Sequence, residues 1–139
     1  SLLESHRPFD LMVIMLGTND LKFRHNRAAA DIAQSAGKLA DLARKSMCGP
    51  NDGVPKVLLM APPATVEAGH ELDALFAGSI AKSQQFPENY AFWADATGAA
   101  FLDAGSVIES SSVDGIHFDP EDHTTLGNAV AIKVRELIG

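Results

Sequence analysis

The chain has 139 residues, of which 46% are apolar and 21% charged, a composition typical of one globular domain. No apolar run approaches the roughly 20 residues that a membrane-spanning helix needs. The net charge of −7 would repel nucleic-acid phosphates and anionic lipid, so neither nucleic acid nor a membrane is an expected partner. The single cysteine, Cys48, cannot form an internal disulfide, and no signal peptide is visible. The lone cysteine favours a cytoplasmic location.

The first half of the chain alternates apolar runs with a helical pattern. Residues 11–16 are six consecutive apolar residues ended by Gly17, which predicts a buried central strand of a parallel sheet. Residues 26–46 repeat apolar side chains every three or four positions and predict an amphipathic helix. Its buried stripe is expected to be Ile32, Ala36, Leu39 and Ala43. Residues 57–61 predict a second buried strand, which Pro62 and Pro63 end.

The second half continues the alternation. Residues 71–97 have a helical pattern that Pro87 must interrupt, and residues 99–102 predict a third strand. A last helix is expected to begin with Asp119 as its N-cap and Pro120 in its first turn. This order predicts an α/β fold, a three-layer sandwich with helices on both faces of a parallel sheet. The sheet has few strands, as if the domain lacked its beginning.

One candidate site segment is Gly17-Thr18-Asn19-Asp20, at the carboxyl end of the first predicted strand. Sites of open α/β sheets gather at such strand ends. Gly17 permits a sharp turn there, and the Asn19 amide is a neutral donor that can stabilise an oxyanion. The alternative is that Asn19 only caps the turn, a common use of asparagine.

A second candidate segment is Asp114-Gly115-Ile116-His117, just before the last helix. The Asp114 carboxylate can accept a hydrogen bond from Nδ1 of His117 and leave Nε2 free to take a proton from a hydroxyl. That arrangement is two thirds of a Ser-His-Asp system. The alternative is a surface histidine beside a turn aspartate.

Taken together, the two segments resemble the SGNH (GDSL-type) hydrolases, and the arylesterase-like bacterial members in particular. The similar segments follow the family's order and spacing: residues 16–20, Pro62-Pro63, Asp103-Ala104-Gly105 and residues 114–117. The resemblance implies a flavodoxin-like fold and a serine esterase that works through an acyl-enzyme, with acyl transfer as a further option. It assigns the oxyanion donor to Asn19, with Gly17 supporting its turn, the general base to His117 and the base's orientation to Asp114. It implies a small ester as substrate and no cofactor, and leaves a homo-oligomer open.

The chain departs from the family at the nucleophile. The family's serine lies in a Gly-Asp-Ser-like motif after its first strand, and no such triplet occurs here. We therefore expect residues 1–139 to be the carboxyl-terminal two thirds of a single SGNH domain. An upstream segment would carry the serine, and the chain alone would be inactive and poorly folded.

Several further residues are candidates for the substrate pocket. They are Thr18, His25, Pro63, Phe76 and Ile116. For His25 the alternative is a solvated loop residue, and for Phe76 it is a core position. Two other functions remain open. One is a metal-dependent hydrolase, whose metal would be bound by the cluster Asp114, His117, Asp119, Asp122 and His123. The other is a non-catalytic α/β module.

Overall fold

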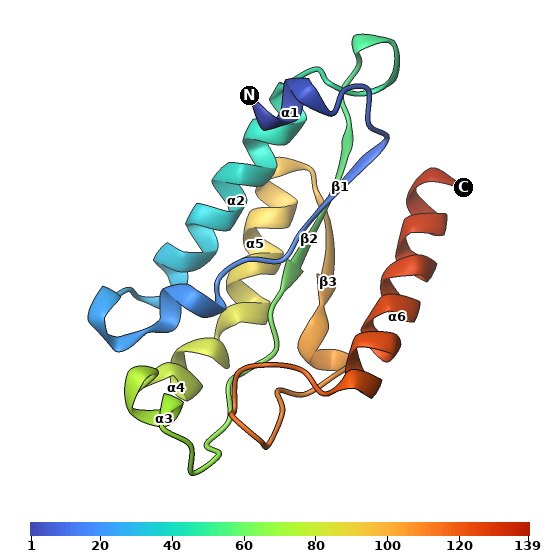
Figure 1. Ribbon diagram of the computed structural model, residues 1–139. Coiled ribbons are helices and arrows are strands. Elements are labelled where there is room, and N and C mark those ends of the chain that lie inside the picture. The colour runs from blue at the N-terminus through green and yellow to red at the C-terminus, as the bar shows by residue number, and fades with distance from the viewer.

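The computed structural model describes residues 1–139 and contains a three-stranded parallel sheet in the order β1-β2-β3 (Figure 1). The strands are β1 (Leu11–Ile14), β2 (Lys56–Ala61) and β3 (Ala100–Asp103). Two long helices, α2 (Ala29–Lys45) and α5 (Phe86–Thr97), cover one face, and α6 (Pro120–Ile138) covers the other. The predicted α/β class, with a parallel sheet between helices, is confirmed.

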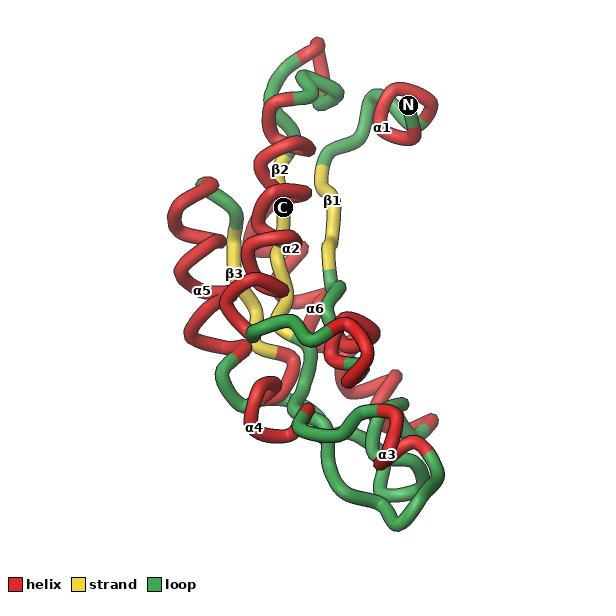
Figure 2. Tube along the Cα trace, turned by 90° about the vertical axis from the view of Figure 1, so that its left-hand side faces the viewer, coloured by secondary structure: helices red, strands yellow, loops and turns green.

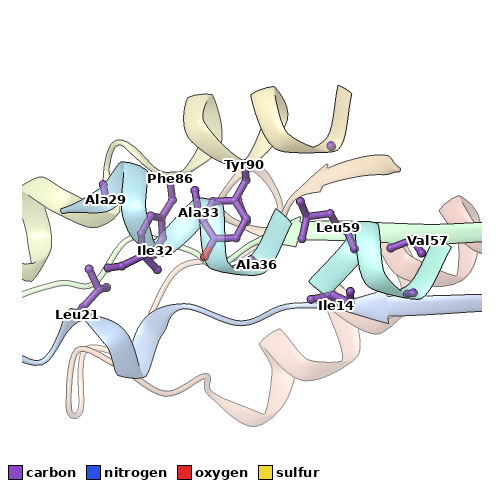
Figure 3. Close-up of a cluster of buried hydrophobic side chains, with 14 of the residues drawn as sticks. Ile14, Leu21, Ala29, Ile32, Ala33, Ala36, Val57, Leu59, Phe86 and Tyr90 are labelled. Atoms are coloured by element: carbon purple, nitrogen blue, oxygen red, sulfur yellow. The ribbon is translucent and has the colours of Figure 1, made fainter. Parts of the chain in front are cut away.

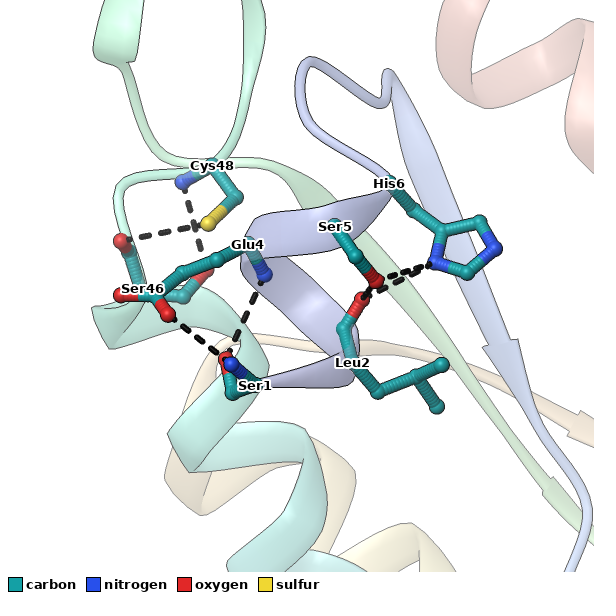
Figure 4. A network of polar contacts seen from close by, with 7 residues as sticks. All are labelled: Ser1, Leu2, Glu4, Ser5, His6, Ser46 and Cys48. Carbon is teal, nitrogen blue, oxygen red and sulfur yellow. Dashed lines mark hydrogen bonds and ion pairs between the residues drawn. The ribbon is translucent and has the colours of Figure 1, made fainter.

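Short helices connect these elements. The α-helical ones are α1 (Leu2–Ser5), α3 (Leu72–Leu75) and α4 (Ser79–Ser83), and the 3₁₀ helices are η1 (Thr18–Leu21), η2 (Phe23–His25), η3 (Pro50–Asp52) and η4 (Ala104–Ser106). Figure 2 shows that most of the long loops gather at one end of the molecule, beyond the carboxyl ends of the strands. α1 lies at the opposite end, against the end of α2 and close to Ser46 and Cys48 (Figures 1 and 4). The amino-terminal polar contacts are therefore remote from this loop-rich end.

The apolar run of β1 predicts a central strand of the whole domain, and the lack of an upstream strand predicts a free edge within residues 1–139. β2 is the central strand, and its residues from Val57 onward are buried. β1 pairs only with β2, so it is an edge strand here, and the side chains of Val13 and Leu16 are 43% and 53% exposed. An apolar run indicates that both faces of a strand are suited to burial, but it does not say whether the covering elements are part of this chain.

The main core lies between the sheet and the α2/α5 pair. It joins Ile14 of β1 and Leu59 of β2 to Ile32, Phe86 and Tyr90 of the helices (Figure 3). A smaller cluster fills the other face, where Leu126 of α6 packs on Leu58 and Met60 of β2. Burial of these apolar side chains, at about 25 cal/mol per Å², is what holds the two helix layers on the sheet.

The helix predictions are largely confirmed. α2 buries Ile32, Ala36 and Ala43 as expected, but Leu39 is 44% exposed and Ala40 is buried in its place. The pattern over residues 71–97 breaks into α3, α4 and α5, and α5 restarts with Pro87 in its first turn. Proline suits that position because the first helical N–H groups have no partner within the helix. None of the helices combines the length and the apolar composition that a bilayer-spanning helix needs.

Candidate active site

The loop-rich end of the sheet brings the two candidate segments together. Asn19 lies in η1, directly after β1, and His117 lies in the loop before α6. Both line one pocket of about 230 Å³. Its other lining residues are Thr18, Ile116, Phe118 and His123. Side chains almost 100 positions apart thus face a single small space because the carboxyl ends of parallel strands meet at one edge.

Asp114 and His117 form the hydrogen bond that their spacing predicts. Nδ1 of His117 lies 2.5 Å from Oδ2 of Asp114, and Oδ1 accepts the N–H groups of His117 and Ile116, both at 2.9 Å. The two backbone N–H groups, His117 first, and then the imidazole lower the pKa of Asp114 to about 2. Asp114 is therefore a carboxylate at neutral pH and accepts the Nδ1 proton. The His117 side chain is 74% exposed, so Nε2 is accessible.

Hydrogen bonds to Ser111 fix the loop that carries His117. The N–H of Ser111 donates to the carbonyl of His117 at 2.7 Å, and its hydroxyl donates to Asp119 at 2.6 Å. Gly115 donates to the Ser111 carbonyl at 2.7 Å and accepts from the N–H of Val66 at 3.1 Å. Asp119 is the N-cap residue of α6 as predicted, but its carboxylate accepts from Ser111 and does not cap the helix.

Glycine is required at position 115. Its φ of +80° lies in the left-handed region, which residues with a side chain rarely adopt. A Cβ at this position would lie 2.1 Å from the carbonyl oxygen of Val66. Val66 lies in the loop that follows β2. This loop and the loop of His117 can approach each other only because residue 115 has no side chain.

Asn19 presents an unpaired amide to the pocket. Its side chain makes no hydrogen bond within the chain, and η1 has no side-chain cap, so Asn19 does not serve as a turn cap. The turn is held by its neighbours: Asp20 donates its N–H to Gly17 at 3.1 Å, and the Asp20 carboxylate accepts from Arg27 at 3.1 Å. A fixed backbone with a free amide is what an oxyanion donor needs.

The predicted pocket residues are distributed unevenly around the site. Thr18 and Ile116 line the pocket of Asn19 and His117. Phe76 belongs to the core and lines a neighbouring pocket of about 470 Å³, which shares Ile116. Pro63 is buried near Gly105, and His25 is exposed; neither lines these two pockets. Two lining residues, Phe118 and His123, were not among the substrate-pocket predictions, although their closeness to His117 in sequence was a signal.

The acidic and histidine residues near α6 are not gathered into a metal site. No group of three or more His, Cys, Asp or Glu side chains lies close enough to hold a metal ion. Asp119 accepts from Ser111, and the His123 ring packs on Phe118 at a centroid distance of 5.4 Å. The geometry thus gives the metal-dependent alternative no support.

No serine of the chain lines the pocket of Asn19 and His117; its only aliphatic hydroxyl is that of Thr18. Three serines lie close to His117 in sequence: Ser110, Ser111 and Ser112. Ser112 is exposed and lines a different pocket, and the hydroxyls of the other two are otherwise engaged. The Ser110 hydroxyl donates to the carbonyl of Ala64 at 2.8 Å, and the Ser111 hydroxyl donates to Asp119. Both side chains are buried. The described residues therefore hold a histidine, its carboxylate and an amide donor, without a serine poised beside them.

Three solved structures of similar fold carry esterase names. The aryl esterase of M. smegmatis matches with a TM-score of 0.92 at 37% sequence identity, over 99% of this chain and 65% of its own. The carbohydrate acetylesterase Est24 of Sinorhizobium meliloti matches with a TM-score of 0.92 at 36% identity, over 99% and 65%. A second carbohydrate acetylesterase family member from Sinorhizobium meliloti gives 0.91 at 31% identity, over 99% and 66%.

The chain thus spans about 65% of the length of the aryl esterase. No protein-family model matches the chain, and no curated protein matches it in sequence. The near-complete coverage of this chain at identities above 30% nevertheless agrees with the motifs at Asn19 and His117. The chain belongs to the SGNH (GDSL-type) hydrolase family.

Proposed function

We propose that this chain provides the general base, its orienting carboxylate and one oxyanion donor of a carboxylic ester hydrolase. The observation that carries the proposal is the shared pocket of Asn19 and His117, with Asp114 bound to Nδ1 of that histidine. An activated imidazole and a neutral amide donor at one point are suited to acyl transfer. The names of the similar structures, aryl esterase and carbohydrate acetylesterase, support the same reaction class.

The proposed reaction has two steps. A serine hydroxyl attacks the acyl carbon of the ester while Nε2 of His117 takes its proton, and the Asn19 amide stabilises the oxyanion. The imidazolium then gives that proton to the departing alcohol, which leaves an acyl-enzyme. In the second step water attacks the same carbon, His117 takes the water proton, and return of the proton to the serine oxygen releases the acid. A different alcohol in place of water would give acyl transfer.

The serine of this scheme is proposed to come from outside residues 1–139. The absence of a Gly-Asp-Ser triplet and of any serine in the pocket supports this, as does the coverage of 65% of the aryl esterase. Residues 1–139 would then form the carboxyl-terminal two thirds of one catalytic domain. The serine-bearing segment is its necessary partner.

The free edge of β1 offers a place for that segment. One side of β1 has no paired strand, and an apolar groove of about 610 Å³ runs beside it. The apolar residues of the groove come from the β1 region, from α2 and from α1, among them Ile14, Leu16, Leu39, Leu42 and Leu2. An unpaired edge of this kind accepts another strand. A parallel strand added here would end beside Gly17, which would place a residue at its carboxyl end near Asn19.

The proposed substrate is a small ester with an apolar group. The pocket of about 470 Å³ next to the site is lined largely by apolar residues, among them Leu72, Phe76, Ile80 and Ile116. Ile116 lines both this pocket and the one with His117, so a group bound against it would extend away from the reacting atoms. Such a space is suited to an acyl or aryl group.

The proposal is tested with the native protein that contains this chain. We expect His117→Ala to lower kcat on an activated aryl acetate by roughly 10³-fold or more, because it removes the base in both steps. The matched control is His6→Ala, which removes an exposed imidazole at the opposite end of the molecule and should leave kcat unchanged. Near wild-type hydrolysis by His117→Ala would refute the proposal.

A further inference from the structure

A tyrosine of α5 reaches the turn that carries Asn19. The Tyr90 hydroxyl donates a hydrogen bond to the carbonyl oxygen of Leu16 at 2.5 Å, across 74 positions of sequence. The ring is completely buried and packs edge-on against Phe86, with a centroid distance of 5.1 Å. Figure 3 shows Tyr90 extending from α5 past α2, with its oxygen toward the segment that follows β1. Tyr90 does not line the pocket of Asn19 and His117, and its hydroxyl makes no hydrogen bond to the side chains that do.

Gly17 fits against the same hydroxyl. A Cβ at position 17 would lie 2.0 Å from the Tyr90 oxygen, and the φ of Gly17 is +142°, which disfavours any other residue. The backbone at the end of β1 therefore passes directly over the tyrosine oxygen. Gly17 and Tyr90 together determine where the chain turns, two residues before Asn19.

Arg27, which lies just before α2, connects the same turn to that helix. Arg27 donates to the Asp20 carboxylate at 3.1 Å, and also to the Asp31 carbonyl at 2.8 Å and the Ser35 hydroxyl at 2.6 Å. Burial, and then the charge of Asp20, raise the pKa of the Tyr90 hydroxyl. Tyr90 therefore remains a protonated donor at neutral pH. Asn19 lies between two anchored points, with its own amide free.

We propose that Tyr90 is a positioning residue that holds the Asn19 amide where the oxyanion forms. This inference rests on the proposed function of Asn19. An oxyanion donor must lie within about 2.7–3.1 Å of the developing charge, and a displacement near 1 Å can cost about 100-fold in rate. The ring alone would fill the core equally well as phenylalanine. The hydroxyl is therefore the group that connects α5 to the backbone turn before Asn19.

The test is a double-mutant cycle between Tyr90→Phe and Asn19→Ala in the native protein that contains this chain. We expect Tyr90→Phe to lower kcat about tenfold or more, with KM within about twofold. In the Asn19→Ala background, the same change should have little further effect because the donor that it positions is gone. The control is Thr97→Val, which removes a hydroxyl of α5 that bonds only within its own helix and should leave kcat unchanged.

Three results would overturn the inference: no loss of kcat in Tyr90→Phe, a loss confined to KM, or an equal loss in both backgrounds. Hydrogen exchange separates failure of this inference from failure of the proposed function. Tyr90→Phe should speed exchange of the Asp20 amide, which bonds to Gly17, whatever the reaction is. If exchange rises but Asn19→Ala leaves kcat unchanged, the oxyanion role of Asn19 fails; unchanged exchange would refute the anchoring itself.

Discussion

Nδ1 of His117 lies 2.5 Å from Oδ2 of Asp114, while Oδ1 of the same carboxylate accepts two backbone N–H groups of the loop. Asp114 thus organises the backbone of the loop and the ring at its end at the same time. The hydrogen bond to Asp114 orients the imidazole, although the His117 side chain is 74% exposed. Local sequence spacing is sufficient to build this half of the site.

Asp114→Asn should impair the reaction without removing the base. Asparagine can still accept a backbone N–H, but it no longer stabilises the positive imidazolium or fixes its tautomer. We expect kcat on an activated ester to fall by a smaller factor than in His117→Ala, with little change in KM. Steady-state kinetics of both variants check this order. A larger loss in Asp114→Asn than in His117→Ala would contradict the assigned roles.

Asp114 also gives stability a defined pH dependence. Its pKa is lowered from 3.8 to about 2, so the folded protein holds the carboxylate ionised where the unfolded chain would protonate it. The resulting stabilisation is fully present above about pH 4 and is lost as the pH falls towards about 2. We expect the difference in Tm between wild type and Asp114→Asn to be steady above about pH 4 and to close below it. A constant difference down to about pH 2 would show that the carboxylate charge is not the cause.

Asn19→Ala should affect the chemical step. Loss of one oxyanion donor typically lowers kcat about 10²–10³-fold, because the interaction exists only in the transition state. KM should change little. Asn128→Ala is the matched control, since it removes an exposed amide from α6 outside the pocket. A rise in KM at constant kcat would instead make Asn19 a group that binds the substrate.

Gly115→Ala should separate the two loops that meet at Val66. The methyl group would need space now occupied by the Val66 carbonyl, and a left-handed backbone costs alanine roughly 1–2 kcal/mol in addition. We expect a lower Tm and a lower kcat. Gly69→Ala is the control because Gly69 has a similar φ, +69°, but nothing within 4 Å of its added Cβ. Equal effects of the two substitutions would mean that backbone strain, not crowding at Val66, is responsible.

The fold could be predicted from sequence because each main element carries its own local signal. The apolar run at residues 57–61, the helical spacing of α2 and the proline at the start of α5 all depend on neighbouring residues only. The pairing of Asp114 with His117 is equally local. That Asn19 would meet His117 followed from a general rule on parallel sheets, applied to the predicted strand order.

Other features depended on distant parts of the chain. Nothing near Gly17 in sequence indicates that Tyr90 lies against it, since the two are joined only by packing of α5 on the sheet. Asp119 is a residue type that commonly caps helices, and it precedes Pro120. Its carboxylate nevertheless accepts a hydrogen bond from the Ser111 hydroxyl instead of from the first N–H groups of α6. The apolar run of β1 shows only that both faces of the strand suit burial, since actual burial depends on neighbouring strands as well as on its own side chains.

The central claim is that His117 and Asn19 act on a serine from outside residues 1–139. The most direct test treats the native protein that contains this chain with a serine-directed fluorophosphonate and locates the label by mass spectrometry. The 139-residue chain is treated alone in parallel, and again after addition of a separately expressed segment of the native protein that bears a Gly-Asp-Ser-like motif. We expect the label on a serine outside residues 1–139, no label on the chain alone, and ester hydrolysis to appear with the added segment. A label on a serine of this chain, together with turnover by the chain alone, would contradict the account.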